Sequence, residues 1–354
     1  MKKTVSLILL IAIISGALFL CSCDGKEEKT QKTLYNASFI TLFDTVTVIK
    51  GYEETQEEFA AVAQEVFSFL EGYHKMFDIY YEYSGINNLC TVNKNAGKPV
   101  VVDPEMLDML DFAIEMHKKS SGKVNIAMGS VLSIWHDYRE EGINHPEDAK
   151  LPTNEELQAA YEHTDINNIK IDREASTVTL LDDKMRLDVG AVAKGYATEL
   201  AARFLESKGK TGYILSVGGN VRTVGKKADG GDWRLGVENP FHTDGGDEYV
   251  CKINVPGGYS LVTSGNYQRY YTVDGKRYHH IIDPDTLFPR DEYVLVSVLT
   301  RDSGVADSLS TALFNMSVEE GKQLLGQLED AEAVWYYSDG TVVYSDGIEA
   351  YLTN

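Results

Sequence analysis

Residues 270–282, YYTVDGKRYHHII, carry the clearest local indication of the fold. Two short runs rich in tyrosine, valine and isoleucine flank Asp274-Gly275, and this dipeptide is a strong indication of a β-hairpin. Residues 334–343 repeat the arrangement around a second Asp-Gly pair. The sequence therefore predicts antiparallel strands that lie next to one another along the chain.

Helical segments form separate blocks between these strand pairs. Residues 53–76 place apolar side chains at helical spacing, and residues 191–208 are rich in alanine and end at a glycine. Asp103 followed by Pro104 is a typical helix start. Because helices and strands do not alternate, the sequence predicts an α+β fold, with one domain of paired antiparallel strands and flanking helices over residues 37–354.

The amino-terminal residues predict export. Two lysines precede an apolar run over residues 5–20, which is short for a membrane span and typical of a secretory signal. The run ends in Leu-Cys-Ser-Cys, which resembles the lipobox of bacterial lipoproteins. The resemblance implies a signal peptide at 1–22, lipidation of Cys23, a flexible tether at 23–36, and anchoring to the cell membrane on its extracytoplasmic face. An ordinary secreted protein cut nearby is the alternative.

The chain is strongly acidic, with a formal net charge of -21. This charge argues against nucleic acid or an anionic membrane surface as a partner. To bind a phosphate ligand, such a chain would need positive charge close to the site, supplied by a metal, helix N-termini or a few lysines. Cys90 and Cys251 are the only cysteines beyond the lipobox, and either one disulfide or two free thiols is compatible with an exported protein.

Two segments near the carboxyl end carry residues suited to phosphate chemistry. His280 and Asp283 lie in the segment HHIIDP, and Asp307 and Thr311 lie four residues apart, on one face of a helix. Hard oxygen ligands so placed suit Mg²⁺. The alternative is two polar residues on a solvent-facing helix, but this helix is largely apolar, and polar groups within it would need partners.

A third candidate segment joins a predicted strand to the alanine-rich helix. It starts at Asp188 and continues through a Gly-Ala turn to Lys194. A backbone carbonyl freed by that turn is a ligand for a hard cation, and the lysine and the helix N-terminus suit a phosphate group. A plain loop with a capping carboxylate is the alternative.

Taken together, these segments resemble the ApbE family, the FAD:protein FMN transferases. The matching strings are LDVGAVAKGYATELAARFL from residue 187, LSVGGNVRTVG from residue 215, TSGNYQRYYTVDGKRYHHIIDPDT from residue 263 and ADSLSTALF from residue 306. Weaker matches begin at residues 42, 77 and 122. The resemblance spans nearly all of residues 38–350 and keeps the motifs in the order and spacing of the family.

The resemblance implies a single ApbE-like (T-fold-like) domain that acts with Mg²⁺ on FAD as its substrate. Such enzymes split the pyrophosphate of FAD, release AMP and attach FMN through a phosphoester to a threonine or serine. The acceptor is a flavoprotein subunit of a membrane or exported redox system. Some members instead hydrolyse FAD to FMN and AMP, and a flavin-binding lipoprotein without catalysis is a third possibility from another class.

The site residues of the family are assigned to this chain only where its sequence matches the family motifs. The metal ligands implied by the resemblance are the Ala191 carbonyl, the Asp307 carboxylate and the Thr311 hydroxyl. The implied FAD contacts are Phe43, Tyr80, Val124, Asn125, Ile126, Asp188, Lys194 and Ile282. His280 and Asp283 are expected near the pyrophosphate, with Asp283 as the candidate base or orienter of the incoming hydroxyl.

The chain departs from the family pattern at three places. The usual Phe-Asp pair is Val124-Asn125, the glycine that usually follows the Thr of the DPxTG segment is Leu287, and the proline usual near Ser130 is absent. The first two are expected to touch the flavin pocket and a turn beside the site. They could therefore alter affinity or shift the balance between transfer and hydrolysis.

Overall fold

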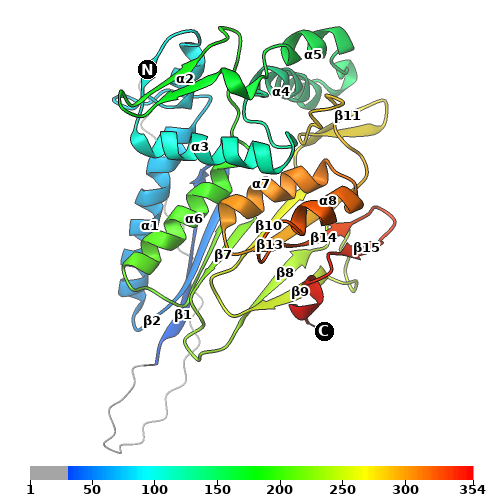
Figure 1. The fold of residues 1–354 in the computed structure, drawn as a ribbon. Coiled ribbons are helices and arrows are strands. Elements are labelled where there is room, and N and C mark those ends of the chain that lie inside the picture. Colours follow the sequence, from blue (N-terminus) through cyan, green and yellow to red (C-terminus); the bar gives the residue numbers. More distant parts are fainter. Residues whose placement is uncertain (1–30, 354) are drawn as a thin grey trace, which may run out of the picture.

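The computed structural model describes residues 31–353, which are built around an eight-stranded antiparallel sheet (Figure 1). In spatial order its strands are β1 (Thr33–Leu42), β2 (Thr45–Glu53), β6 (Tyr213–Val217), β7 (Asn220–Val224), β10 (Ser260–Gly265), β13 (Leu295–Thr300), β14 (Glu332–Tyr336) and β15 (Val342–Tyr344). The predicted α+β class is confirmed.

Helices and smaller sheets surround this central sheet. The helices are α1 (Gln56–Phe77), α2 (Leu89–Lys94), α3 (Pro104–Lys119), α4 (Gly129–Asn144), α5 (Asn154–Tyr161), α6 (Ala193–Ser207), α7 (Ser303–Phe314) and α8 (Val318–Leu325). The smaller sheets are β8 (Trp233–Glu238) with β9 (Tyr249–Val255) and β16 (Leu352–Thr353), β3 (Val100–Val101) with β5 (Thr177–Leu180) and β4 (Ile169–Asp172), and the hairpin of β11 (Tyr270–Val273) with β12 (Lys276–His279).

The middle of the central sheet is buried on both faces. Every residue of β13 is buried, and successive side chains of a strand point to opposite faces. Val296 and Val298 therefore belong to the core under the helices. Leu295 and Leu299 pack instead into a second core that they share with Trp233 of the β8–β9 sheet. This two-sided burial explains why the strand is a continuous run of mainly apolar residues.

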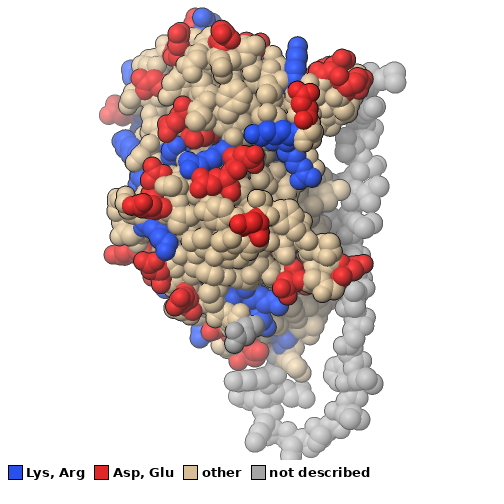
Figure 2. Space-filling model, turned by 90° about the vertical axis from the view of Figure 1, so that its right-hand side faces the viewer, with Lys and Arg blue, Asp and Glu red and all other residues tan. Residues whose placement is uncertain are grey.

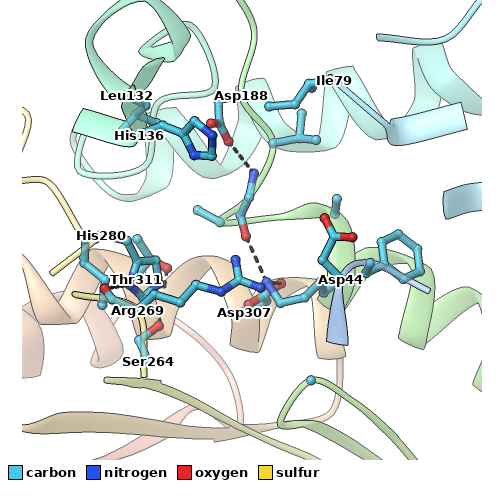
Figure 3. A pocket seen from close by; sticks show the side chains of 18 of the residues that line it. Asp44, Ile79, Leu132, His136, Asp188, Ser264, Arg269, His280, Asp307 and Thr311 are labelled. Atoms are coloured by element: carbon cyan, nitrogen blue, oxygen red, sulfur yellow. Dashed lines mark hydrogen bonds and ion pairs between the residues drawn. The ribbon is translucent and has the colours of Figure 1, made fainter. Parts of the chain in front are cut away.

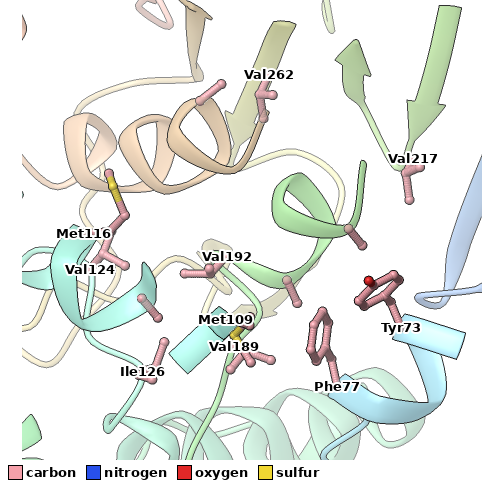
Figure 4. Packing of buried hydrophobic residues seen from close by; sticks show 14 of the residues in the cluster. Tyr73, Phe77, Met109, Met116, Val124, Ile126, Val189, Val192, Val217 and Val262 are labelled. Atoms are coloured by element: carbon pink, nitrogen blue, oxygen red, sulfur yellow. The ribbon is translucent and has the colours of Figure 1, made fainter. Parts of the chain in front are cut away.

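Helices α1 and α3 and the segment before α6 bring apolar side chains together in the core. Phe77 of α1, Met109 of α3, and Val189 and Val192 in the segment before α6 converge in one cluster (Figure 4). All four are at most 4% exposed. Burial of a large apolar side chain contributes about 1.5–3 kcal/mol, so this cluster fixes the loop before α6 firmly against two helices.

Helices α6 and α7 approach each other closely at Gly195. A Cβ atom on this residue would collide with the Asp307 Cβ and with the Ser303 carbonyl. The absent side chain lets the Gly195 N–H donate a hydrogen bond to Asp307 Oδ2 over 2.7 Å. The close approach therefore sets the position of a buried carboxylate relative to the start of α6.

The structure differs from the sequence interpretation at the amino-terminal end. Residues 33–36, expected in a flexible tether, belong to strand β1 because they pair with Lys50–Glu53 of β2. Strands β1 and β2 form a hairpin that turns at Phe43 and Asp44, which have positive φ angles of 53° and 50°. Cys23 and the signal peptide lie outside the described residues. Cys90 and Cys251 are free thiols.

The described part of the chain carries a mixed surface. Lys and Arg side chains are interspersed with Asp and Glu on the face of the molecule in Figure 2. Among residues 31–353, none of the helices combines the length and apolar character that a membrane span requires.

Leu287 occupies a turn in the left-handed region, with φ of 63°. This conformation explains why glycine is usual here. The leucine side chain is 2% exposed, and its carbonyl accepts a hydrogen bond from Trp135 Nε1. Leu287 thus combines a strained backbone with a well-packed side chain.

Leu287→Gly is expected to destabilise the protein by about 2 kcal/mol. Loss of a buried leucine costs about 2–5 kcal/mol, and relief of the left-handed strain returns about 1–2 kcal/mol. Denaturant unfolding measures the difference. Leu287→Ala is the matched control and should be less stable than the glycine variant, because it loses the packing and keeps the strain. A glycine variant as stable as the wild type would contradict this weighting.

Candidate active site

Most of the sequence-predicted site residues line one cavity of about 460 Å³. Its walls come from the β1–β2 turn, the segment after α1, the α3–α4 connection, α4, the loop before α6, the β10–β11 connection, the β12–β13 connection and α7. In Figure 3, Asp188 and His136 lie at one end of the view, and Asp307, Thr311 and Ser264 lie at the other. Segments far apart in the sequence therefore build one site.

Asp307 is buried at the bottom of this cavity. Its side chain accepts the Gly195 N–H at 2.7 Å, and Lys194 Nζ lies 4.0 Å from its Oδ2. Burial raises the pKa of the Asp307 carboxyl, while Lys194 and the Gly195 N–H act in the opposite direction. The carboxylate is thus held in a dry position with incomplete charge compensation, which suits a bound cation.

Ala191 lies immediately before helix α6. The first helical hydrogen bond runs from the Tyr196 N–H to the Val192 carbonyl, and the Gly195 N–H is taken by Asp307. The Ala191 carbonyl consequently receives no backbone hydrogen bond from the described residues. Ala191 lines the cavity together with Asp307 and Lys194, and the Lys194 ammonium donates to the Gly190 carbonyl at 3.0 Å.

Thr311 follows Asp307 by one helical turn and also lines the cavity. Ser264 at the end of β10 lies 3.4 Å from the Thr311 hydroxyl and 2.8 Å from the Ser310 hydroxyl. The apolar helix α7 thus presents a carboxylate and a hydroxyl to the cavity. A carboxylate, a hydroxyl and a free carbonyl are hard oxygen donors, and this set fits Mg²⁺.

The two neighbouring histidines have different roles. His279 is buried, and its Nε2 donates to the Arg290 carbonyl at 2.9 Å, which makes it structural. His280 lines the cavity, and its Nδ1 lies 3.3 Å from the Arg269 carbonyl. Because a carbonyl only accepts, the neutral His280 ring carries its proton on Nδ1 and leaves Nε2 as an acceptor. Burial, aided by nearby cationic groups, lowers the pKa of His280 to about 3.

Asp283 lies beside the cavity and is absent from its lining. The ammonium of Lys123, which does line the cavity, donates to Asp283 Oδ1 and Asp285 Oδ2, both at 2.8 Å. Asp283 also ties its own turn together, because its carbonyl accepts the Leu287 N–H. Its side chain therefore anchors a lysine that comes from the α3–α4 connection.

Most of the expected flavin contacts line the same cavity. These are Phe43, Tyr80, Val124, Asn125, Asp188, Lys194 and Ile282. Ile126 differs, because its side chain is buried in the core and its carbonyl accepts the Asp188 N–H. Burial raises the pKa of the Asp188 carboxyl, which accepts the Gly190 N–H at 2.8 Å.

Many of the lining residues were not identified from the sequence, and three polar ones bear on the chemistry of the site. Arg139 comes from α4, Arg269 from the β10–β11 connection and Asn220 from the start of β7. Asn220 is 1% exposed, its amide nitrogen donates to the Val217 carbonyl, and its Oδ1 has no partner within the described chain. Arg269 and Asn220 lie inside strings that match the family, but no residue type or spacing marks Arg139.

Comparison with known proteins identifies the family. The sequence model of the ApbE family matches residues 43–335. A FAD:protein FMN transferase of Vibrio cholerae is 30% identical over 88% of this chain and 88% of that protein, and one of Haemophilus influenzae is 28% identical over 92% and 90%. The crystal structure of the ApbE protein of Thermotoga maritima is 25% identical, with a TM-score of 0.78 over 91% of this chain and 100% of that chain. The resemblance is confirmed, and this chain belongs to the ApbE family.

Proposed function

We propose that this protein is a Mg²⁺-dependent FAD:protein FMN transferase. It attaches FMN through a phosphoester to a threonine or serine of an exported or membrane redox protein and releases AMP. One observation carries the proposal: the buried Asp307 carboxylate faces, with the Thr311 hydroxyl and the Ala191 carbonyl, into a cavity that also holds neutral His280. The names of the Vibrio and Haemophilus relatives support the transfer of FMN from FAD to a protein.

The residues that would hold the cation are Ala191, Asp307 and Thr311. Bound Mg²⁺ supplies charge stabilisation at the phosphate oxygens. Lys194 stands next to this position and offers an ammonium group to the same oxygens. The site therefore concentrates positive charge where the anhydride bond of FAD breaks.

His280 is the proposed proton acceptor for the incoming hydroxyl. Its Nε2 carries a lone pair because Nδ1 faces the Arg269 carbonyl. A weak nucleophile such as a serine or threonine hydroxyl needs orientation and a nearby base. Asp283 acts in this proposal through Lys123, whose ammonium it holds at the cavity wall.

The flavin ring is proposed to lie among the aromatic and apolar lining residues. Phe43, Tyr80 and Ile282 supply such surface, and Asp188 and Asn125 supply polar contacts. Tyr80 is 52% exposed, so its ring is available to stack on a planar ligand at the mouth of the cavity.

Lys194→Ala is expected to weaken FAD binding by about ten-fold or more, because a charge-assisted contact to phosphate contributes about 1.5–3 kcal/mol. Fluorescence titration of FAD measures the affinity. Lys322→Ala is a suitable control, since this lysine lies on α8 outside the cavity and pairs with Asp346. Equal FAD affinity in the Lys194 variant and the wild type would rule out a phosphate contact.

We also propose that the protein is exported and anchored through lipidated Cys23 to the extracytoplasmic face of the cell membrane. The basis is the lipobox resemblance of residues 20–23. Metabolic labelling with a palmitate analogue tests it, with Cys23→Ser as the matched variant. Equal labelling of the two chains would contradict lipidation at this residue.

The reaction itself is tested with the full-length chain in detergent. FAD and Mg²⁺ are added with or without a peptide bearing an Asp-x-x-Ser-Gly-Ala-Thr acceptor, and AMP and peptide mass are followed. AMP with an FMN-sized mass gain on the peptide supports the transferase. AMP with free FMN and an unmodified peptide would favour an FAD pyrophosphatase. Bound FAD with no AMP would favour a flavin-binding protein without catalysis.

A further inference from the structure

The cavity carries more positive charge than the transfer mechanism above uses. Its lining includes Lys123, Lys194, Arg139 and Arg269. The ammonium of Lys123 is balanced by Asp283 and Asp285, each at 2.8 Å. That of Lys194 lies 4.0 Å from Asp307 and bonds to a backbone carbonyl. The transfer mechanism gives no role to Arg139 or Arg269.

Arg139 is half-buried and forms no ion pair with a carboxylate of the described residues. Its Nη2 donates instead to His136 Nδ1 at 2.9 Å. Burial lowers the pKa of the Arg139 guanidinium, and nearby Arg269 acts in the same direction. Tyr80, Glu140 and Asp188 act in the opposite direction, but the net effect is still a lowered pKa. A partly buried cation that has another cation nearby and no carboxylate within ion-pair distance gains from an anionic ligand. The arrangement therefore favours an anionic ligand at this position.

Arg269 lines the cavity from the β10–β11 connection. In Figure 3 its side chain lies at the same end of the view as His280, Thr311 and Ser264. Its backbone is fixed, because its carbonyl accepts the His280 N–H at 3.1 Å. Within the described chain its guanidinium also has no carboxylate within ion-pair distance. Arg269 and Arg139 both lower the pKa of His280, which places both charges near this ring.

From this placement, and resting on the proposed use of FAD, we infer that Arg139 and Arg269 form a clamp on the diphosphate of FAD. The planar guanidinium group matches phosphate oxygens in a bidentate manner. In an acidic chain with four carboxylates in the cavity lining, Asp44, Asp78, Asp188 and Asp307, two unpaired guanidinium groups offset the repulsion that a diphosphate meets.

The clamp also acts during transfer. The acceptor oxygen forms a bond to the FMN phosphorus, the bond from this phosphorus to the bridging oxygen breaks, and the hydroxyl proton passes to His280 Nε2. AMP leaves with the bridging oxygen and the bonding electrons. Guanidinium groups near His280 stabilise the charge that develops on this leaving phosphate.

The test is equilibrium binding to the full-length chain in detergent by calorimetry, with FAD, ADP and riboflavin as probes. Arg139→Gln and Arg269→Gln are each expected to weaken FAD and ADP binding about 10- to 100-fold and to leave riboflavin binding unchanged. Arg139→Lys and Arg269→Lys should recover only part of the loss. Arg277→Gln is the matched control, because it removes one arginine of the β11–β12 hairpin that lies outside the cavity lining.

Unchanged FAD and ADP affinity in both glutamine variants would overturn the clamp. An equal loss for riboflavin would also overturn it, since it would indicate a structural defect. Because binding is measured without turnover, a failure of the proposed clamp can be distinguished from a failure of the proposed reaction. A wild type that binds FAD and ADP in an arginine-dependent manner but forms no AMP would support the clamp and contradict the transferase.

Discussion

Asp307→Ala is expected to lower Mg²⁺-dependent AMP release by at least about a hundred-fold while the fold is retained. The carboxylate is the only charged group among the three proposed ligands, and changes even to residues that support metal ligands cost about 10- to 100-fold. Release of AMP from FAD at saturating Mg²⁺ measures the loss. Ser308→Ala is the matched control, because the neighbouring hydroxyl is buried on α7 and donates to the Gly304 carbonyl outside the cavity.

A second variant separates the charge from the local structure. Asp307→Asn keeps an oxygen for the Gly195 N–H and removes the charge. It should lose activity like the alanine variant. It should also lose the rise in melting temperature that saturating Mg²⁺ gives the wild type, since a ligand at 100 times its Kd stabilises by about 2.7 kcal/mol. Normal AMP release and a normal Mg²⁺ effect on melting would remove Asp307 from the metal site.

His280→Gln is expected to lower kcat by about 10²- to 10⁴-fold, the usual contribution of a positioned general base. Because the pKa of His280 in the protein without substrate is about 3, kcat/KM of the wild type should show no titration of this residue between pH 5 and pH 9. His242→Gln, on the exposed β8–β9 connection, is the control. A variant with wild-type kcat would exclude His280 as the base.

The same residue links stability to pH. In the unfolded chain histidine titrates near pH 6.5, and in the folded protein the pKa of His280 is about 3. Between these values the unfolded state binds more protons, so stability falls as pH falls from about 6.5 toward 3. Denaturant unfolding at pH 7.5 and pH 4.5 should therefore show a smaller acid loss for His280→Gln than for the wild type. An equal loss would contradict the lowered pKa.

Local signals in the sequence predicted much of the fold. The Asp274-Gly275 hairpin, the Asp103 cap and the strand pairs each depend on residues within a few positions of one another. The β1–β2 turn was missed because its left-handed positions carry Phe43 and Asp44, where glycine or asparagine would have marked it. The predicted tether extended to residue 36, but residues 33–36 pair with β2 and therefore belong to a strand.

The placement of residues in the cavity was predictable where it follows from spacing on one element. Asp307 and Thr311 share a helix face, and Ala191 with Lys194 marks a helix start. Arg139 was not predictable, because it reaches the cavity only through the packing of α4 against the β11 hairpin. The pairing of Asp283 with Lys123 joins residues 160 positions apart, and no local pattern reports such a contact.

The crossing of α6 and α7 at Gly195 also determines how the cavity can admit its substrate. Because α6 and α7 are in direct contact at this residue, the part of the cavity wall that carries Asp307 is held rigidly. Exchange of a nucleotide must then occur through the rim, where Tyr80 and Tyr81 are exposed beside the β1–β2 turn. A single methyl group at residue 195 would push α7 aside and disable the enzyme while every group that touches the substrate remained in the sequence.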